Sequence, residues 1–541
     1  MKFQAIEVNH NKLIKDYIAQ EKKICSFFDY NPYQQHSFKQ RLIDLTNRDF
    51  NREQLVVLLQ TLYQKWGNNE AVLKQIDRLK EPNSVVVVGG QQAGLLTGPL
   101  YTIHKMVSII LFAKQQEKKL HVPVIPVFWI AGEDHDFDEI NHIYQSVDNR
   151  LIKQKIGQFE LERKSISYLN LDKKKLLEWL NQLFSNLTET DYSLALYQKL
   201  LNITNQAKTY VDFFAIITDT LLGDYGLVQF DSGDPLVKKF ETSYLLSIVD
   251  KQEEIAANVW QQKQRLAGAD YFIDLDLKQN DGHLFYLHQG SRVLLEREEN
   301  GDWASKEGSV RFTKQELIAH IQINPESFSN NVVTRPLMQE YVFPTLTFFA
   351  GPGEIAYWAA LQPGFHALGI KMPPVLPRLS FTLLDRTAEK MIEELGYDIA
   401  QIINQGLEED KLRYLKSQLH PPIDALTEQI MLSIDAVHRP LRELAATLGS
   451  DLEGLAEENM ELINKQISFL RKTIERRVKQ KYQTELNKYD YLQALLRPNQ
   501  AWQERFWNVI PFLNRYGVDW LDELLHTDFS FSKETHYLIK M

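Results

Sequence analysis

Four times along this chain, a continuous run of β-branched and aromatic residues stops abruptly at glycine or acidic residues, and a segment with helical periodicity follows. The runs are SVVVVGG (84–90), PVFWIAG (126–132), YGLVQFD (225–231) and FPTLTFFA (343–350). An uninterrupted apolar run of this length is typical of a parallel strand buried on both faces, and parallel neighbours need crossover connections. The sequence therefore predicts an α/β fold with a mostly parallel sheet.

Two segments interrupt this alternation of strands and helices. They lie at about 150–205 and 265–330, and they mix charged and apolar residues without the pattern of a parallel strand. In the second, Gly282 and Gly290 separate short apolar runs as the turns of β-hairpins would. The first eighty residues instead carry apolar side chains at helical spacing. We therefore expect residues 1–384 to form one core domain that begins with helices and carries two insertions.

The chain changes character from about residue 385, where Glu, Lys, Leu and Gln dominate. One stretch repeats an apolar residue every three or four positions, at Ile463, Ile467, Leu470, Ile474 and Val478. This seam is compatible with an antiparallel coiled coil that also forms a dimer contact, and equally with a plain helical bundle. We predict an α-helical coiled-coil domain at 385–497 and a C-terminal segment, 498–541, that packs back on the core.

The composition argues against several classes of protein. With 541 residues, 44% of them hydrophobic, the chain can build more than one domain. Its single cysteine, Cys25, rules out an internal disulfide framework. The net charge of −10 argues against nucleic-acid binding and favours small-molecule substrates. No apolar run reaches membrane-spanning length and the first residues lack the apolar region of a secretory signal, so we expect a cytoplasmic protein without membrane association.

The first candidate site is the glycine-rich loop GGQQAGLLTGP (89–99), which follows the first strand. Ligands of open parallel sheets bind at the carboxyl ends of strands, where helix N-termini favour anions. Glycines allow close approach of a ligand, and amide or hydroxyl side chains can form hydrogen bonds with it. The loop suits a phosphate or carboxylate, but it matches neither G-x-G-x-x-G nor a Walker A motif, so tight turns without a ligand are the alternative. The candidate binding residues are Gln91, Gln92, Gly94, Thr97 and Gly98.

The second candidate site is the EDHD cluster, which ends the buried run VPVIPVFWIAG. Its members are Glu133, Asp134, His135 and Asp136. We expect the last three to act in acid or base catalysis and Glu133 to contribute to ligand binding. Alternatively, the carboxylates could hold Mg²⁺ through the phosphates of a nucleotide, or simply cap a helix. His142 could share that helix face, but no H-E-x-x-H spacing occurs, so no protein-bound metal is predicted.

Two further turns supply candidate binding residues, the GPGE turn (351–354) and PRLS (377–380). Arginine and serine side chains of the second turn could bind an anion. Two more cations are close in sequence to the strand ends, although each could equally be a solvated surface charge. The candidates in this group are Lys105, Arg335, Gly351, Gly353, Glu354, Arg378 and Ser380.

Taken together, these stretches resemble one protein family. GQQAGLLTGPLYTIHK, PVFWIAGEDHDFDEIN, AGPGEIAYWAALQP and PRLSFTLLD are similar to segments of the bacillithiol biosynthesis cysteine-adding enzymes, and so is the later QERFWNVIPFLNRYG. The resemblance extends over essentially the whole chain. It implies a Rossmann-like core related to nucleotidyltransferases and class I aminoacyl-tRNA synthetases, two connecting-peptide insertions, and a helical coiled-coil domain that mediates homodimer formation.

The activity implied by this resemblance is that of a ligase forming a carbon–nitrogen amide bond. L-Cysteine would be joined to the amine of glucosaminyl malate to give bacillithiol. ATP with Mg²⁺ is the simplest activator of the cysteine carboxylate, through a cysteinyl adenylate or phosphate. Kinship with the synthetases would place residues 91–98 where those enzymes carry their HIGH motif and residues 377–380 where they carry KMSKS, but neither motif is intact here.

Two other functions are compatible with the residues. A nucleotide-responsive scaffold without catalysis would use the coiled coil as its working surface, with the basic stretch RKTIERRVKQK (471–481) binding an anion or a partner. A metal-dependent hydrolase would use the EDHD cluster, although the nucleotide-type turns do not fit that chemistry. Replacing Asp134 and His135 would distinguish an enzyme from a scaffold, which should keep its partner binding.

Overall fold

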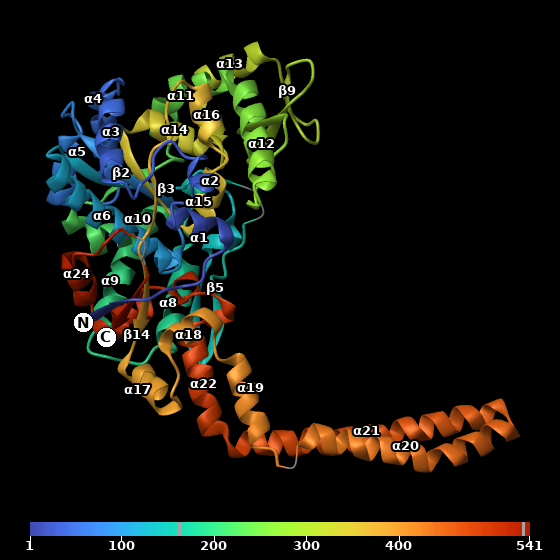
Figure 1. Cartoon of the computed structure of the whole chain (residues 1–541). Helices are drawn as coiled ribbons and strands as arrows, with labels where there is room; N and C mark the ends of the chain where they lie inside the picture. The colour runs from blue at the N-terminus through green and yellow to red at the C-terminus, as the bar shows by residue number, and fades with distance from the viewer. Residues whose placement is uncertain (161–163, 421, 533–535) are drawn as a thin grey trace. The chain divides into compact units, whose positions relative to one another are not determined.

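The computed structural model describes residues 1–160, 164–420, 422–532 and 536–541. The chain forms two compact units, which Figure 1 shows coloured along the sequence. The first unit comprises Met1–Val147, Ile152–Leu384 and Gln503–Met541, and the second comprises Asp148–Leu151 and Asp385–Trp502. Each unit therefore combines segments that are far apart in the sequence.

A five-stranded parallel sheet forms the centre of the first unit. Its strands lie in the order β13 (Val375–Pro377), β12 (Thr345–Ala350), β2 (Val85–Gln91), β3 (Val124–Ile130) and β6 (Val228–Asp231). The predicted apolar runs form four of these strands, and nearly all of their residues are buried, as the uninterrupted patterns require. The α/β class with a parallel sheet is confirmed. The fifth strand, β13, was not predicted because three residues are too short to show a pattern.

Helices connect and cover the strands of this sheet. The helix α6 (Tyr101–Leu120) packs on β2, β3 and β12, and α5 (Glu70–Arg78) packs on β3 and β6. The crossover and covering helices are α1 (Lys12–Ile18), α2 (Lys22–Cys25), α3 (Gln35–Thr46), α4 (Arg52–Tyr63), α5 (Glu70–Arg78), α6 (Tyr101–Leu120), α10 (Tyr210–Leu222), α11 (Pro235–Asp250), α12 (Gln252–Gly268), α14 (Thr334–Val342), α15 (Pro352–Trp358) and α16 (Gln362–Ala367).

A smaller sheet joins the beginning and the end of the chain. The strand β1 (Lys2–Ala5) is antiparallel to β15 (His536–Lys540), which runs parallel to β14 (Ser380–Leu384). Two helices, α23 (Ile510–Tyr516) and α24 (Asp519–His526), precede β15. The first eighty residues are thus not helical throughout. The strand β1 is only four residues long and mostly exposed, so its pairing depends on a partner that no local pattern reveals.

The interrupting segments carry structure of their own. The first contains β4 (His142–Val147), β5 (Arg150–Lys155), α8 (Lys173–Ser185) and α9 (Ser193–Gln206). The second forms an antiparallel sheet in the order β10 (Arg311–Phe312), β9 (Trp303–Ser305), β8 (Ser291–Arg297), β7 (Asp281–His288) and β11 (Phe328–Asn330), with α13 (Lys314–Ile323) before β11.

The two glycines of the second segment have different roles. Gly290 lies in the tight turn between β7 and β8 with φ of 82°, as predicted. Gly282, by contrast, lies inside β7, where the register shifts between Asp281 and Leu284. A Cβ at this position would clash with the carbonyl oxygen of Leu295, so the glycine permits a bulge and close backbone approach instead of a turn.

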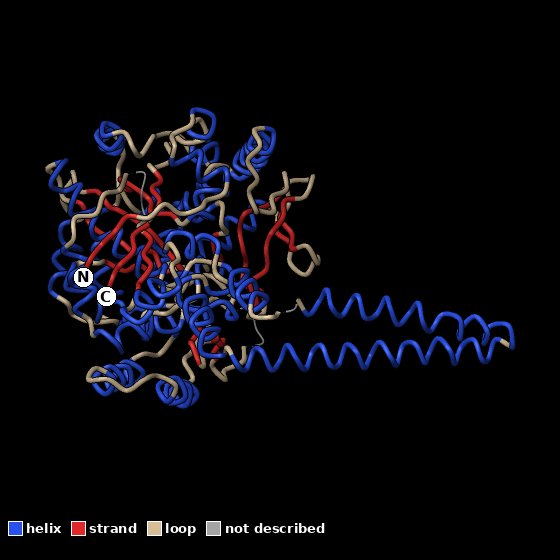
Figure 2. The backbone as a smooth tube through the Cα atoms, turned by 60° about the horizontal axis from the view of Figure 1, so that its bottom comes forward, coloured by secondary structure: helices blue, strands red, loops and turns tan. Residues whose placement is uncertain are grey.

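The second unit is helical. Its helices are α17 (Arg386–Leu395), α18 (Ile399–Gln405), α19 (Glu408–Ser417), α20 (Ile423–Leu448), α21 (Ser450–Lys481) and α22 (Gln483–Leu496). The two longest, α20 and α21, run antiparallel as a hairpin, which Figure 2 shows as the pair of long blue helices. The predicted coiled-coil arrangement is therefore present. In the described part of the chain, no helix is both long and apolar enough to cross a membrane.

Candidate active site

The carboxyl ends of the parallel strands bring three predicted segments to one edge of the sheet. Gln91 at the end of β2 is paired with Ile130 at the end of β3, and Ile130 is paired in turn with Asp231 at the end of β6. On the other side of β2, Phe349 in β12 is paired with Gly89. The glycine-rich loop, the EDHD cluster and the GPGE turn therefore leave the sheet at neighbouring positions.

The glycine-rich loop has a strained backbone that a later part of the chain holds in place. Leu96, Thr97 and Gly98 have φ values of 51°, 75° and 69°, a left-handed conformation that is costly for residues other than glycine. The side-chain amide of the fully buried Asn508 donates to the carbonyl oxygens of Leu96 at 2.9 Å and Gly98 at 2.6 Å. A Cβ at Gly94 would lie 2.8 Å from Gly98 Cα. The loop conformation is thus fixed by the protein itself.

Lys105 of α6 connects this loop to the GPGE turn. Its side chain is 1% exposed, and Nζ donates to the carbonyl of Gly90 at 2.7 Å, to Gln91 Oε1 at 3.2 Å and to Glu354 Oε2 at 2.5 Å. Burial lowers the pKa of this ammonium group, while the carboxylate of Glu354 raises it. A Cβ at Gly89 would lie 3.1 Å from the lysine stem, so the glycine makes room for it. Three of the predicted binding residues are thus in direct contact.

The GPGE turn begins α15. Glu354 Oε2 accepts the backbone N–H of Gly351 at 2.7 Å, which closes the first turn of this helix. Gly353 is exposed, and a Cβ there would meet nothing within 4 Å. Packing therefore explains the position of Glu354 but gives no reason for glycine at 353.

The three predicted cations lie near Glu354. Arg335 of α14 donates to the hydroxyl of Tyr357 at 3.2 Å. The charges of both Arg378 and Arg335 contribute to lowering the pKa of Lys105, so all three cations belong to one electrostatic neighbourhood. Glu354 pairs with Lys105 and Glu504 pairs with Arg378, so one positive charge of the three is left over, which favours an anionic ligand.

Arg378 and Ser380 are buried and already have partners. Both terminal nitrogens of Arg378 donate to the carboxylate of Glu504 at 2.6 Å, and His104 Nδ1 lies 2.7 Å from the same carboxylate. Burial alone would raise the pKa of Glu504, but Arg378 and His104 hold it well below its usual range. Ser380 Oγ lies 2.9 Å from His536 Nδ1. These contacts hold Ser380 in the core, and they occupy both terminal nitrogens of Arg378.

On the opposite side of the glycine-rich loop, Asp134 and His135 meet residues from distant segments. Gln92 Nε2 donates to Asp134 Oδ2 at 2.5 Å, and the backbone N–H of His135 donates to Asp134 Oδ1 at 2.7 Å. Arg292 of β8 places Nη1 3.2 Å from His135 Nδ1 and 3.6 Å from Asp134 Oδ1. The loop, the EDHD cluster and the inserted antiparallel sheet therefore converge here.

Glu133 is buried and belongs to a cluster of charges behind these residues. Its Oε2 accepts from Lys238 Nζ at 2.6 Å and from the backbone N–H of Asn330 at 3.1 Å. Lys238 also lies 3.4 Å from Glu241, whose pKa burial raises. Glu133 therefore lies behind the exposed strand edge, where it connects the inserted sheet to the core.

Asp136 and His142 make contacts that differ from those of Asp134 and His135. Asp136 is exposed and caps the short helix α7 (Phe137–Ile140), accepting from the N–H of Glu139 at 3.3 Å. His142 does not share this helix face, because α7 ends at Ile140 and His142 begins β4. Burial lowers the pKa of His142 to about 4. In residues 1–160, 164–420, 422–532 and 536–541, no three His, Cys, Asp or Glu side chains are grouped to hold a metal ion.

Several residues of this edge were not predicted as site residues, namely Asp231, Lys238, Arg292, Glu504 and Asn508. Asp231 ends one of the apolar runs, so the rule that identified the EDHD cluster applies to it as well. Glu504 and Asn508 lie in QERFWNVIPFLNRYG, which was quoted only for its resemblance. Arg292 follows a hairpin turn in the second insertion, and no local pattern distinguishes it from a surface arginine.

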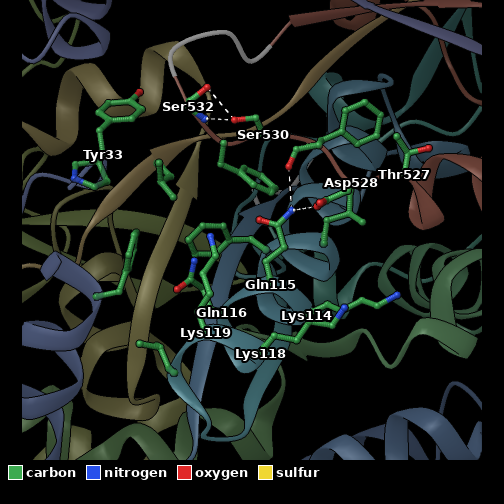
Figure 3. A pocket seen from close by; sticks show the side chains of 18 of the residues that line it. Tyr33, Lys114, Gln115, Gln116, Lys118, Lys119, Thr527, Asp528, Ser530 and Ser532 are labelled. Atoms are coloured by element: carbon green, nitrogen blue, oxygen red, sulfur yellow. Dashed lines mark hydrogen bonds between the residues drawn. The ribbon is translucent and has the colours of Figure 1, made fainter. Parts of the chain in front are cut away.

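A large pocket lies elsewhere on the first unit, along the second half of α6. It has a volume of about 1330 Å³, and its lining includes Lys114, Lys118 and Lys119. Figure 3 shows Gln115 in this pocket donating to Asp528 Oδ1, at 2.8 Å, and to a backbone carbonyl. None of the predicted site residues lines it. This pocket is therefore separate from the strand edge that carries the predicted residues.

Comparisons with known proteins identify the family. Residues 1–379 match the family model described as bacillithiol biosynthesis BshC, N-terminal Rossmann-like domain, and residues 381–541 match that of its C-terminal coiled-coil domain. Relatives from Oceanobacillus iheyensis and Bacillus velezensis are 39% and 40% identical, each over 98% of both chains, and one from Bacillus cereus is 37% identical over 100% of both. All three are named "Putative cysteine ligase BshC". Since the two models together span nearly the whole chain, this protein belongs to the bacillithiol biosynthesis BshC family.

Proposed function

We propose that this protein is a cysteine ligase that joins the carboxyl group of L-cysteine to the amine of glucosaminyl malate, with ATP and Mg²⁺ as cosubstrates. The names of the relatives support a ligase acting on cysteine. The single structural observation that carries the proposal is the strand edge, where a cationic group and an acid–histidine pair flank one glycine-rich loop.

The cationic side of this edge suits the anionic substrates. Glucosaminyl malate carries the two carboxylates of malate, and ATP carries phosphates. Arg335 lies near the loop and is the side chain we assign to these anions, whereas the three N–H groups of the buried Lys105 already donate to Gly90, Gln91 and Glu354. Arg378 already forms a bidentate pair with Glu504, so its part is to maintain the positive potential of the edge.

One feature of the glycine-rich loop supports the binding of a phosphate group there. The hydroxyls of Thr97 and Thr102 are buried and have no hydrogen-bond partner among the residues that the structure describes. The glycines at 90 and 94 are required by the packing of the protein itself, because a Cβ would lie 2.7 Å from Trp129 O and 2.8 Å from Gly98 Cα. Bound ATP would supply the activation of the cysteine carboxyl group, and this chain would supply hydrogen-bond donors and positive charge.

Amide formation itself requires a free amine, stabilisation of the negative charge that develops on the carbonyl oxygen, and a group that accepts a proton. The amine nitrogen forms the new bond to the activated carboxyl carbon, the leaving group departs with the electron pair of its bond, and the amine releases one proton. Asp134 is the carboxylate beside His135 that could accept this proton. Arg335 would hold a substrate anion while the bond forms, and Lys105 would keep the glycine-rich loop and Glu354 in place.

The decisive experiment is a reconstitution with purified protein. Glucosaminyl malate, L-cysteine and ATP with Mg²⁺ are supplied together and with each one omitted, and products are identified by mass spectrometry. We expect bacillithiol only in the complete mixture, together with AMP or ADP. Absence of product in every mixture, from folded protein, would contradict the proposal and favour a scaffold or a different cysteine donor.

A charge substitution in the cationic group tests its assignment. Lys105→Met removes a buried ammonium that binds the loop and Glu354, so we expect kcat/KM to fall at least about 100-fold. Lys114→Met is the matched control, because Lys114 is an exposed lysine of the same helix outside the strand edge. Equal activity of both variants would contradict the assignment of Lys105.

A further inference from the structure

Arg292 is held in one orientation by three strands of the inserted sheet. Its guanidinium lies 3.8 Å from the ring centre of Phe285 in β7, while Nε donates to Ser329 Oγ at 2.8 Å and Nη2 to the carbonyl of Asn330 at 2.5 Å, both in β11. The remaining terminal nitrogen, Nη1, lies 3.2 Å from His135 Nδ1. Because the stacking and two hydrogen bonds fix the guanidinium plane, the direction of Nη1 is fixed as well.

This contact defines where the proton of His135 resides. An arginine side chain has only donors, so the nitrogen that faces it must accept. His135 Nδ1 therefore carries no proton, and the neutral ring carries its proton on Nε2. An imidazolium would direct a second N–H and a positive charge at Arg292, which is unfavourable at this distance.

The charged groups whose contacts around His135 the structure describes are compatible with this assignment. Asp134 Oδ1 lies 3.5 Å from His135 Nδ1, but it accepts the backbone N–H of His135 at 2.7 Å. Asp134 Oδ2 accepts from Gln92. Glu133, which is paired with Lys238, and Asp134 help to keep the guanidinium of Arg292 charged against the effect of burial. Asp136 is exposed and caps α7.

We propose that Arg292 is a positioning residue that holds His135 as the neutral tautomer with its proton on Nε2, so that His135 donates a hydrogen bond during catalysis instead of accepting a proton. The inference deepens the proposed ligase function and rests on it. The donor would serve the carbonyl oxygen on which negative charge develops as the amine attacks. The inserted sheet thereby contributes a residue that completes the strand-edge site.

The proton assignment can be tested without any activity measurement. Protein labelled with ¹⁵N in its histidines is examined by NMR between pH 6 and 8, and the His135 signals are identified by their loss in His135→Gln. We expect protonated Nε2 and unprotonated Nδ1 across this range in the unaltered protein. A protonated Nδ1 would overturn the inference, whatever the ligase assay shows.

Three substitutions separate positioning from a merely structural role. Arg292→Met retains the apolar stem over Phe285 but removes the donor, so we expect the proton to shift toward Nδ1 and Asp134 and kcat to fall about 100-fold with little change in KM. Arg292→Lys retains the positive charge but not the planar set of donors, so we expect it to restore only part of the Nε2–H population and part of kcat. Arg297→Met is the matched control, because Arg297 lies in the same strand and pairs with Glu253.

The outcomes distinguish this inference from the proposed function. If the unaltered protein makes no product but shows the Nε2–H tautomer, the ligase proposal fails and the role of Arg292 in setting the tautomer stands. If product forms and Arg292→Met changes neither the tautomer nor kcat, the inference fails and the ligase remains. If Arg292→Met does not fold, the unaltered protein and Arg292→Lys still decide the tautomer.

Discussion

Asp231 shows how a single residue at the strand edge links stability to pH. It is buried at the end of β6, where it accepts from Ser167 Oγ at 2.7 Å and from the N–H of Gly233 at 3.0 Å. Burial outweighs these hydrogen bonds and raises its pKa from 3.8 to about 7. The folded protein therefore binds a proton that the unfolded chain releases between these two values. Stability from this group is fully present below pH 3.8 and is lost as the pH rises to about 7.

Replacing this carboxyl group should remove its pH dependence. Asp231→Asn retains an acceptor for Ser167 but cannot ionise. Between pH 3.8 and about 7 the variant therefore avoids the loss of folding stability, about 1.4 kcal/mol per pH unit, that the buried aspartate causes. We expect the melting temperature of the variant, relative to the unaltered protein, to increase by roughly 3 °C between pH 5 and pH 8. Differential scanning calorimetry at both pH values measures this, and a constant difference would show that Asp231 does not titrate in the window.

At the scale of elements, the glycine-rich loop depends on Asn508 in the turn before α23. The two hydrogen bonds from Asn508 hold the carbonyls of Leu96 and Gly98 on either side of Thr97. Three consecutive positive φ values are unfavourable unless the surroundings enforce them. The loop thus owes its shape to a contact with a distant segment and not to its own glycines alone.

Removing this contact should release the loop. In Asn508→Ala we expect amide hydrogen exchange at 95–98 to accelerate about 10- to 100-fold, because two buried hydrogen bonds are worth about 1–3 kcal/mol. Mass spectrometry of peptic peptides provides the measurement. Asn514→Ala is the control, since the buried Asn514 lies in the same motif but binds Thr188 and Ser193. Similar loop exchange in both variants would contradict the assigned role of Asn508.

The same elements show what the sequence could predict. The strands β2, β3, β6 and β12 were predictable because burial on both faces produces continuous apolar runs. The strand-end rule then located Asp134, His135, Lys105 and Glu354 near one edge. Arg292 could not be predicted in this way, because its role depends on how a separate antiparallel sheet meets the core. The pairing of Arg378 with Glu504 could not be predicted either, because the two residues are 126 positions apart in the sequence.

At the scale of the whole molecule, the helical hairpin α20–α21 leaves many apolar side chains exposed. Leu432, Leu441, Leu444, Leu455 and Phe469 are between 57% and 67% exposed. Apolar side chains in such number along two helices favour burial against another surface. The dimer contact expected from the resemblance would supply that surface, and it stays a prediction.

Shortening the hairpin tests this prediction. We expect the full-length protein to sediment as a dimer and a variant with Ile423–Lys481 replaced by a short glycine–serine linker to sediment as a monomer. Leu441→Asp with Leu444→Asp should weaken the dimer and leave the helices intact by circular dichroism. A full-length monomer in analytical ultracentrifugation would exclude the hairpin as a dimer contact.

The Asn508 contact also has a consequence for synthesis on the ribosome. Asn508 follows the carbonyls that it binds by 412 and 410 residues. At about 5–20 residues per second, some 400 residues take roughly 20–80 s to translate. During that interval the nascent loop lacks the hydrogen bonds from Asn508, and Arg378, once it is made, waits a further 126 residues for Glu504. A product truncated before residue 503 would therefore lack both Glu504 and Asn508, and with them the contacts that hold Arg378 and the glycine-rich loop.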